Sequence, residues 1–258
     1  TPNRSVEYVS IPIVPSAEDF ADTENLFKSL ENDFKTLDDI TAIVNGNSDV
    51  LYDGRDYSIE TIPAEYKEFA FDKNTKKGDC TELAFANDTY SIARVMDCGY
   101  TKVDSVKLAA IVNNEEQEIG WVTLTEIPTN IAEPAASGKK GSTFTVANGM
   151  NEQTFKILDK SKATPKVKLA ILSRKVSASS KTYGILYNQA KQFIVANNNA
   201  DSLHQAALTQ GLSTTPVFAL AGNDDKVNEL KNSRAIVKWA FDAEQGQVSD
   251  VFECGNQF

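Results

Sequence analysis

The feature of this sequence that most constrains its fold is a short pattern that occurs twice and, in a weaker form, a third time. The pattern is Ala-Phe-Asp, a short charged run and then Gly, and it occurs in Ala70–Leu83 and in Trp239–Phe258. A weaker copy, AASGKKGSTFTV, occupies Ala135–Val146. Because self-similarity along a chain is typical of repeated structural units, the sequence predicts a fold that uses one unit three times.

Three consecutive units are expected, at residues 1–101, 102–163 and 164–258, the last truncated before its final strand. Each unit opens with a β-branched and apolar run that is typical of a half-buried or buried strand. These runs begin at Val6, Val106 and Val167. Each unit ends in a predicted hairpin, because turn-forming residues interrupt its last apolar run. The turn pairs are Asn87-Asp88, Asn148-Gly149 and Gly255-Asn256.

Helices are predicted between the strands of the first and third units. Ser16 and Asp19 have the spacing of a capping box, and residues of one helical face follow at spacings of three and four. These are Phe20, Thr23, Phe27, Leu30 and Phe34. The corresponding residues of the third unit are Tyr183, Leu186, Tyr187, Ala190, Phe193 and Ile194, and a further helix from Asp201 to Gln210 ends at Gly211. Because one-sided helices must cover a sheet, the predicted class is α+β, with small, mainly antiparallel sheets covered by helices.

The second and third units depart from the pattern. Only Asn113–Ile119 separate the opening strand of the second unit from Gly120-Trp121, so the unit is either reduced or lacks a segment. A reduced unit of this kind is expected to pack on a neighbour or to be completed by other sequence. The third unit stops at Phe258 where a last strand should begin, which leaves an unpaired sheet edge.

Composition excludes some classes of function. The net charge of −10, from 36 acidic and 26 basic residues, disfavours binding to nucleic acid. No apolar run reaches the roughly 18 to 20 residues that span a bilayer, and Thr1 indicates a processed or excised piece of a longer protein. The three cysteines have no metal-site spacing and are expected to be unpaired, so no metal or cofactor is predicted and the redox compartment stays open.

The predicted order of elements in a unit is strand, helices, strand, helix and hairpin. With EYVSIPIVPSAEDF near the start, Asn47–Asp49, Gly120-Trp121 and Ala240–Ser249, this order resembles the parvulin-type peptidyl-prolyl cis/trans isomerases of the SurA and PpiD kind, and most of all their long multi-unit versions from Bacteroidetes. The resemblance implies repeated parvulin-like (rotamase) units of a periplasmic folding factor and chaperone. It also implies a membrane anchor in the full-length parent, contact with the inner-membrane secretion machinery and binding of unfolded or proline-containing polypeptide.

Catalysis by this family has a structural requirement that the chain does not meet. Rotation about an X–Pro bond faces a barrier of roughly 20 kcal/mol. The resemblance implies that active members use two histidines on adjacent inner strands. The matching positions here are Tyr8, Ser91, Ala110, Gln153 and Ala170. The one histidine, His204, falls inside a predicted helix at neither position, so the pair is absent and no catalytic residue is assigned.

Apolar positions that hold the proline in the family are better matched. They correspond to Ile62 and Tyr66 in the first unit and to Ile127 and Ile131 in the second. A peptide cradle can survive loss of the polar catalytic groups, because binding needs mainly desolvated apolar surface. Apolar residues at a helix start are also common in cores. The repeated Ala-Phe-x-Gly pattern is interpreted in the same way, as a helix end whose Phe enters the core before a turn at Gly.

Two hypotheses of different classes follow. In the first, these units bind unfolded polypeptide or scaffold an active domain without catalysis. In the second, the chain is an active parvulin isomerase that uses substituted polar residues such as Tyr8, Ser91 or Gln153. A structural spacer or docking surface for a membrane partner is a third possibility that the sequence does not separate from the first.

Overall fold

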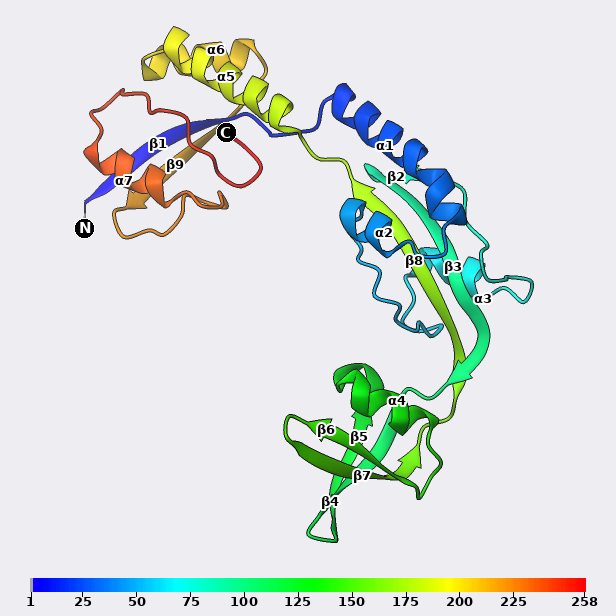
Figure 1. Ribbon diagram of the computed structural model, residues 1–258. Coiled ribbons are helices and arrows are strands. Elements are labelled where there is room, and N and C mark those ends of the chain that lie inside the picture. Colours follow the sequence, from blue (N-terminus) through cyan, green and yellow to red (C-terminus); the bar gives the residue numbers. More distant parts are fainter. Residues whose placement is uncertain (1) are drawn as a thin grey trace. The chain divides into compact units, whose positions relative to one another are not determined.

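The computed structural model describes residues 2–258, which form two compact units (Figure 1). The terminal unit combines both ends of the chain, residues 1–28 and 175–258, and the central unit comprises residues 29–174. The expected α+β class with small antiparallel sheets is confirmed.

The terminal unit is organised around an antiparallel pair of strands from opposite ends of the sequence. Strand β1 (Asn3–Ser10) pairs with β9 (Ser213–Ala221), with Tyr8 opposite Thr215. Its helices are α5 (Ser180–Ala196), α6 (Ala200–Thr209), α7 (Arg234–Asp242) and the start of α1 (Ala17–Thr36). Val6 and Tyr8, which share one face of β1, pack against a cluster of buried residues from β9 and α7. This cluster includes Val217, Leu220, Ile236, Val237 and Ala240.

The last residues of the chain add a short segment beside the end of β1. Gly255 adopts a positive φ of 71°, as the predicted turn requires, and the Cys254 N–H donates to Gln257 O at 2.9 Å. Ile11 and Phe258 then exchange both backbone hydrogen bonds, at 2.8 and 2.9 Å. Two bonds between the same two residues are the mark of an antiparallel pair. Residues 256–258 therefore lie antiparallel to residues 11–13.

A capping box and an N-cap meet in the terminal unit, where α1 and α5 begin. Ser16 and Asp19 form the expected box, with Ser16 N donating to the carboxylate at 2.8 Å and Asp19 N donating to Ser16 Oγ at 3.2 Å. Ser179 caps α5 by accepting from Thr182 N, and the Thr182 hydroxyl donates to the Asp19 carboxylate at 2.6 Å. One buried carboxylate, only 5% exposed, therefore joins the two helix starts.

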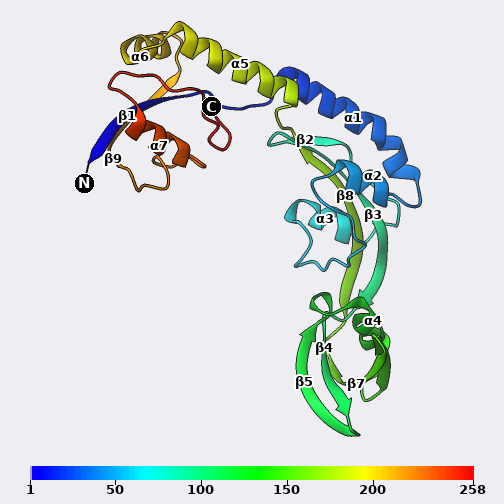
Figure 2. The same ribbon diagram turned by 60° about the vertical axis from the view of Figure 1, so that its left-hand side comes forward.

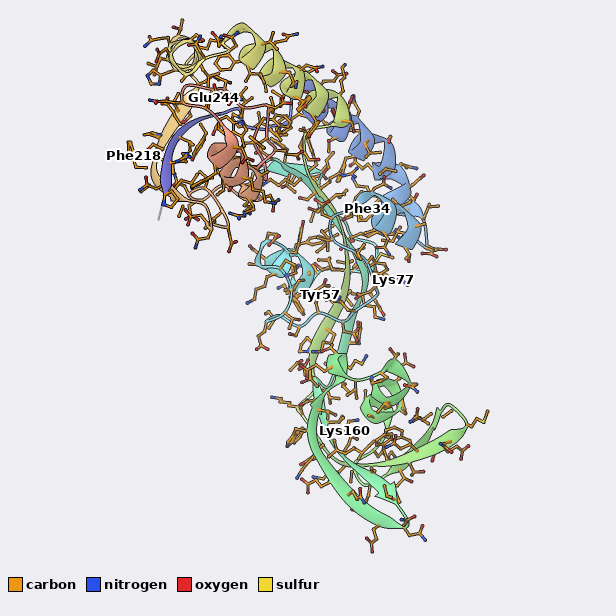
Figure 3. All side chains as sticks on the ribbon, turned by 90° about the vertical axis from the view of Figure 1, so that its left-hand side faces the viewer. Phe34, Tyr57, Lys77, Lys160, Phe218 and Glu244 are labelled. Atoms are coloured by element: carbon orange, nitrogen blue, oxygen red, sulfur yellow. The ribbon has the colours of Figure 1, made fainter. Side chains whose placement is uncertain are left out.

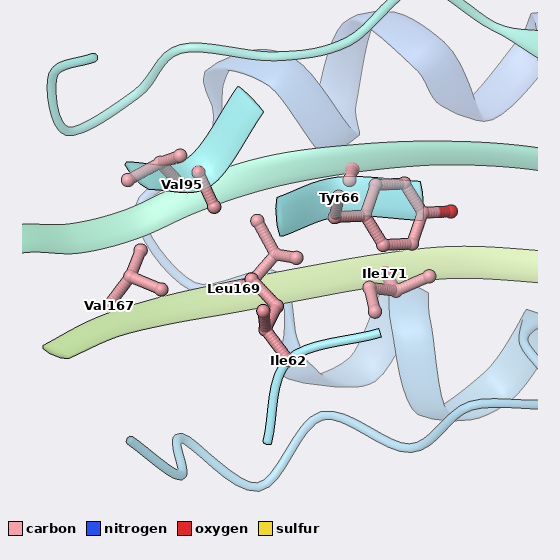
Figure 4. Packing of buried hydrophobic residues seen from close by; sticks show 8 residues of the cluster. Ile62, Tyr66, Val95, Val167, Leu169 and Ile171 are labelled. Carbon is pink, nitrogen blue, oxygen red and sulfur yellow. The ribbon is translucent and has the colours of Figure 1, made fainter. Parts of the chain in front are cut away.

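The central unit contains a three-stranded sheet in the order β2-β3-β8. Its strands are β2 (Ala84–Ala86), β3 (Thr89–Lys102) and β8 (Thr164–Lys175), accompanied by α2 (Thr41–Asn47), the 3-10 helix η1 (Ala64–Tyr66) and α3 (Lys67–Phe71). On the side of β8 away from β3, Tyr57 adds an isolated antiparallel bridge to Val167. The core packs η1 and α3 on β3 and β8 through residues such as Ile62, Tyr66, Val95, Leu169 and Ile171 (Figure 4).

The Asn47–Asp49 motif connects α2 to the edge of this core. The Ser48 hydroxyl lies 3.0 Å from Ile171 O and accepts from Ser173 N at 2.9 Å, and Asp49 N donates to Ser173 O at 2.7 Å. These bonds satisfy backbone groups of β8. The motif is therefore a structural link between a helix end and a strand.

A four-stranded antiparallel sheet lies between β3 and β8 in the sequence (Figure 2). Its order is β5-β4-β7-β6, from β4 (Ser105–Val112), β5 (Glu115–Thr123), β6 (Thr143–Asn148) and β7 (Asn151–Lys160). The 3-10 helix η2 (Leu124–Glu126) and α4 (Thr129–Ser137) cover one face, burying Val106, Leu108 and Ile157. Asn113 and Asn114, with φ of 53° and 64°, close β4 onto β5 as a two-residue turn. The expectation that this reduced unit needs a neighbour for its core is corrected, because its own helix covers the sheet.

The observed units differ from the expected consecutive division into 1–101, 102–163 and 164–258. The strand at Val6, expected to open the first unit, pairs with β9 of the expected third unit. The strand at Val167, expected to open the third unit, neighbours β3 of the expected first. The opening strands of these two units are thus exchanged. Their sequences are similar, and a strand pattern specifies a buried face but not a partner.

The recurring Ala-Phe pattern marks the same local structure three times, with one correction. Ala70, Ala135 and Ala240 each lie in the helix before the turn and are at most 4% exposed. Gly78, Gly141 and Gly246 follow with φ of 94°, 86° and 82°. In two copies the glycine N–H donates to the neighbouring strand, Gly78 to Val95 O and Gly141 to Ile157 O, both at 2.7 Å. The alanine is the fully buried residue, whereas Phe71 and Phe241, expected to enter the core, are only partly buried at its margin.

Replacing Asp19 should destabilise the terminal unit. Hydrogen bonds from Ser179, Thr182 and Ser16 hold the pKa of this carboxyl well below its usual range. The folded pKa is depressed, so its stabilisation is present above the unfolded pKa of about 4 and is lost as the pH falls toward the folded value. Asp19→Ala should cost about 2 kcal/mol at neutral pH, because it leaves buried donors unpaired.

Urea unfolding of the wild type, Asp19→Ala and Asp19→Asn between pH 2 and pH 7 measures this contribution. The stability difference between the wild type and either variant should shrink as the pH falls below about 4. A difference that is constant across this range would show that the ionised carboxylate does not hold the two helix starts together.

Candidate functional site

A cavity of about 710 Å³ in the terminal unit is the candidate site. It is lined by residues 3–11 along β1, by α5 and α6, by α7, and by residues 243–252. Figure 3 marks Glu244 in this last segment, which follows α7. The side chains include Phe193, Ile194, Leu203, Ile236, Trp239 and Phe252. The size is typical of ligand-binding pockets, and these apolar side chains share the walls with many polar residues.

Strand β1 presents different side chains to the helices on its two faces. Val6 and Tyr8 pack with the buried cluster of α7, whereas the Glu7 carboxylate lies 3.0 Å from Nδ1 of His204 in α6. Alternate residues of a strand point to opposite faces, so α6 and α7 lie on opposite sides of β1. Figure 1 shows these helices on either side of the strand. The cavity therefore has apolar helices on both sides of the strand.

Charged groups lie along the cavity lining. Glu7, Glu244 and Asp250 contribute carboxylates, and Arg4 contributes a guanidinium that stands 5.1 Å from the Phe241 ring. The ammonium group of Lys191 donates to Asp250 at 2.6 Å and lowers the pKa of that carboxyl. The site thus combines mixed apolar and polar walls with charged groups, several of which already have partners.

One edge of β1 has no strand neighbour among the described residues. Pairing with β9 occupies one edge of Asn3–Ser10, and residues 256–258 pair on the other edge only at residues 11–13. Backbone groups of alternate residues point to the same edge, so the N–H and C=O groups of Val9 and Glu7 face the same way as those of Ile11. These groups form an open sheet edge beside the cavity.

The five positions that match the family's histidines are spread over three sheets. Tyr8 lies in the terminal unit and Ser91 in the central unit. Ser91 lies on β3, beside the β8 strand that carries the fully buried Ala170. On the four-stranded sheet Ala110 is opposite Phe155, and Gln153 is opposite Val146. Of these five positions, Tyr8 lines the cavity.

The expected proline-gripping residues are core residues. Ile62 and Tyr66 are 6% and 8% exposed and belong to the central cluster. Burial raises the pKa of the Tyr66 phenol, which is hydrogen-bonded to Ser91. Ile127 and Ile131 are partly buried against the core under α4. None of the four lines the 710 Å³ cavity.

The remaining candidates have ordinary structural partners. His204 pairs with Glu7 in an exposed setting, and Cys80, Cys98 and Cys254 are free thiols. Within residues 2–258 there is no group of three His, Cys, Asp or Glu side chains that could hold a metal ion. No helix in this described range is long and apolar enough to cross a membrane.

The sequence matches no protein-family model, and neither the curated proteins nor the solved structures give a significant match to the chain.

Most of the cavity lining was missed by sequence reasoning. Trp239 and residues 243–252 belong to the repeated stretch that was interpreted as a packing and turn element. The stretch does form a turn and pack against the core, as predicted. In this copy its side chains also line the cavity. The sequence carried little signal for this wall, because Trp239 corresponds to Phe69 of the first copy, an aromatic residue that packs at the margin of the central core.

Cys254 offers a direct probe of this cavity. Its side chain lines the cavity, it is 5% exposed, and burial raises the pKa of its thiol. In a Cys80→Ser, Cys98→Ser variant, the remaining thiol should react at pH 8 at least about tenfold more slowly than an unfolded control, because the thiolate is the reactive form. Thiol-disulfide reagent kinetics with and without urea measure this ratio. Equal rates in folded and unfolded protein would contradict the buried position.

Proposed function

We propose that this chain binds extended, unfolded polypeptide without catalysing isomerisation, as parvulin-like units of a periplasmic folding factor. The observation that carries the proposal is the cavity beside β1, which lies between helices on both faces of the strand and contains apolar side chains such as Phe193 and Trp239. Unfolded chains expose the apolar side chains that such a site removes from water.

The arrangement of elements supports the parvulin-like part of the proposal. The terminal unit contains a strand, helices, a second strand, a helix and the turn at Gly255. The four-stranded sheet has the same order without the first helices, since a tight turn replaces them. The central three-stranded sheet has the helix and hairpin of that order, with β8 in the place of the opening strand.

The chemistry of the three sheets argues against catalysis. At the positions of the family's histidines stand Tyr8 in the terminal unit, Ser91 and Ala170 on neighbouring central strands, and Ala110 and Gln153 on the four-stranded sheet. No sheet places two titratable side chains at these positions. Catalysis needs polar groups placed against the transition state, whereas binding needs chiefly apolar surface.

Filling the cavity should weaken polypeptide binding. Ala243→Trp places a large side chain at a partly buried position of the cavity wall and should weaken binding of a reduced, carboxymethylated unfolded protein at least about tenfold. Ala147→Trp is the matched control, because Ala147 is exposed on β6 and does not line the cavity. Fluorescence anisotropy of a labelled unfolded protein measures both affinities. No saturable binding by the wild type would remove the proposal.

The isomerase alternative predicts a different result. A protease-coupled assay on an X–Pro peptide should give the uncatalysed rate at micromolar concentrations of this chain, because no described site pairs the required groups. If the rate rises in proportion to protein concentration, and Tyr8→Phe or Ser91→Ala removes the increase, these substituted polar residues are catalytic and the non-catalytic part of the proposal fails.

A further inference from the structure

We propose that Asn148 is a modification site, at which the folded chain spontaneously loses the side-chain amide and forms aspartate and isoaspartate. The sequence contains two Asn-Gly pairs, Asn45-Gly46 and Asn148-Gly149. A glycine after an asparagine leaves the backbone nitrogen accessible, because glycine has no side chain to shield it. The structure distinguishes the two pairs: the first is held by hydrogen bonds, and the second is free to react.

The reaction joins the Asn148 side chain to the next backbone nitrogen. The nitrogen of Gly149 attacks Cγ of Asn148 and forms a bond to it. The bond from Cγ to Nδ2 breaks, and the side-chain nitrogen leaves as ammonia with the proton of the Gly149 N–H. Water then opens the cyclic imide. Opening at Cγ gives aspartate, and opening at the main-chain carbonyl carbon gives isoaspartate, so water is the only co-reactant.

The reacting nitrogen lies in the turn between β6 and β7. Asn148 pairs with Asn151, and Gly149 follows with a φ of 65°. Met150 has no positive φ, so this is the pattern of a type II′ turn with Gly149 as its first central residue. The pair that closes such a turn does not use the N–H of this glycine, and no described residue accepts from it. The nitrogen is therefore free.

The Asn148 side chain is free as well. It is exposed, and among residues 2–258 its amide has no hydrogen-bond partner. Only the pair with Asn151 fixes the backbone of Asn148 at the end of this ladder. Terminal pairs of a hairpin open at a low cost in free energy. Opening this one pair lets the tip rotate until the two reacting atoms meet.

The other Asn-Gly pair is held, although Asn45 is also exposed. Tyr52 N donates to Asn45 Oδ1 at 2.7 Å, and Asn45 Nδ2 donates to Tyr52 O at 3.1 Å. Both residues of the pair lie in α2, where the Gly46 N–H donates to a carbonyl four residues earlier. Attack here requires the loss of both side-chain bonds and of a helical turn. Hydrogen bonding, and not exposure, separates the two pairs.

The modification changes the end of one hairpin. It adds a negative charge to a chain whose net charge is already −10, next to the pair formed by Ala147 and Glu152. Isoaspartate also inserts an extra carbon atom into the backbone of the turn. Because turn type and loop length fix the register of a hairpin, the closing pair of Asn148 and Asn151 cannot persist in that product.

The test incubates the 258-residue chain at pH 8 and follows the peptides that contain Asn148 and Asn45 by mass spectrometry after short tryptic digestion. In the folded chain Asn148 should convert at least about tenfold faster than Asn45, because its reaction requires the opening of one terminal pair and not of a helix. In urea that unfolds the chain the two rates should agree within about threefold, since neither pair is then held.

Asn148→Gln is the control for the position of the reaction, because the same tryptic peptide contains Asn151. Glutamine would have to close a larger ring, so the mass gain of this peptide should disappear while the rate at Asn45 stays unchanged. Circular dichroism melting establishes that the variant folds.

Three results would overturn the proposal. The first is conversion of Asn148 in the folded chain that is no faster than conversion of Asn45. The second is a preference for Asn148 that is as large in urea as in the folded chain, because it would then arise from neighbouring residues and not from the hairpin. The third is a mass gain that persists in Asn148→Gln, which would place the reaction at Asn151.

Discussion

Pairing of β1 with β9 is the interaction on which the terminal unit depends. It joins residues roughly 200 positions apart, such as Tyr8 and Thr215, and it brings Val6 and Tyr8 onto the apolar face of α7. Closing so long a loop costs entropy that only long-range contacts can offset. The Asp19 carboxylate, which caps α1 and accepts from Thr182 of α5, stabilises the same unit where the two helices begin.

This pairing also creates the candidate site. Strand β1 forms one wall of the cavity, and its free edge opens beside the segment that follows α7. The walls combine apolar and polar side chains, and no pair of titratable groups occupies the positions that an isomerase would use. Such a surface is suited to holding an extended chain through its backbone and apolar side chains.

Local structure was largely predictable from the sequence, whereas strand partners were not. The capping box at Ser16, the turn at Asn87-Asp88 and the one-sided helices follow from short-range rules and are confirmed. The opening strands at Val6 and Val167 have similar patterns, so periodicity could not show that they are exchanged. The candidate site was predictable only in part. Tyr8 lines the cavity, but Ile62 and Tyr66, which were expected to bind peptide, belong to the central core.

Amide hydrogen exchange along β1, followed by NMR, tests the central claim most directly. In the chain alone, the amides of Val6 and Tyr8, which point to β9, should be protected, and those of Glu7 and Val9 should exchange quickly. Saturating unfolded polypeptide should slow the exchange of amides in the part of β1 that lines the cavity. Unchanged exchange along Asn3–Ile11 at saturating polypeptide would contradict a cavity that binds extended chains.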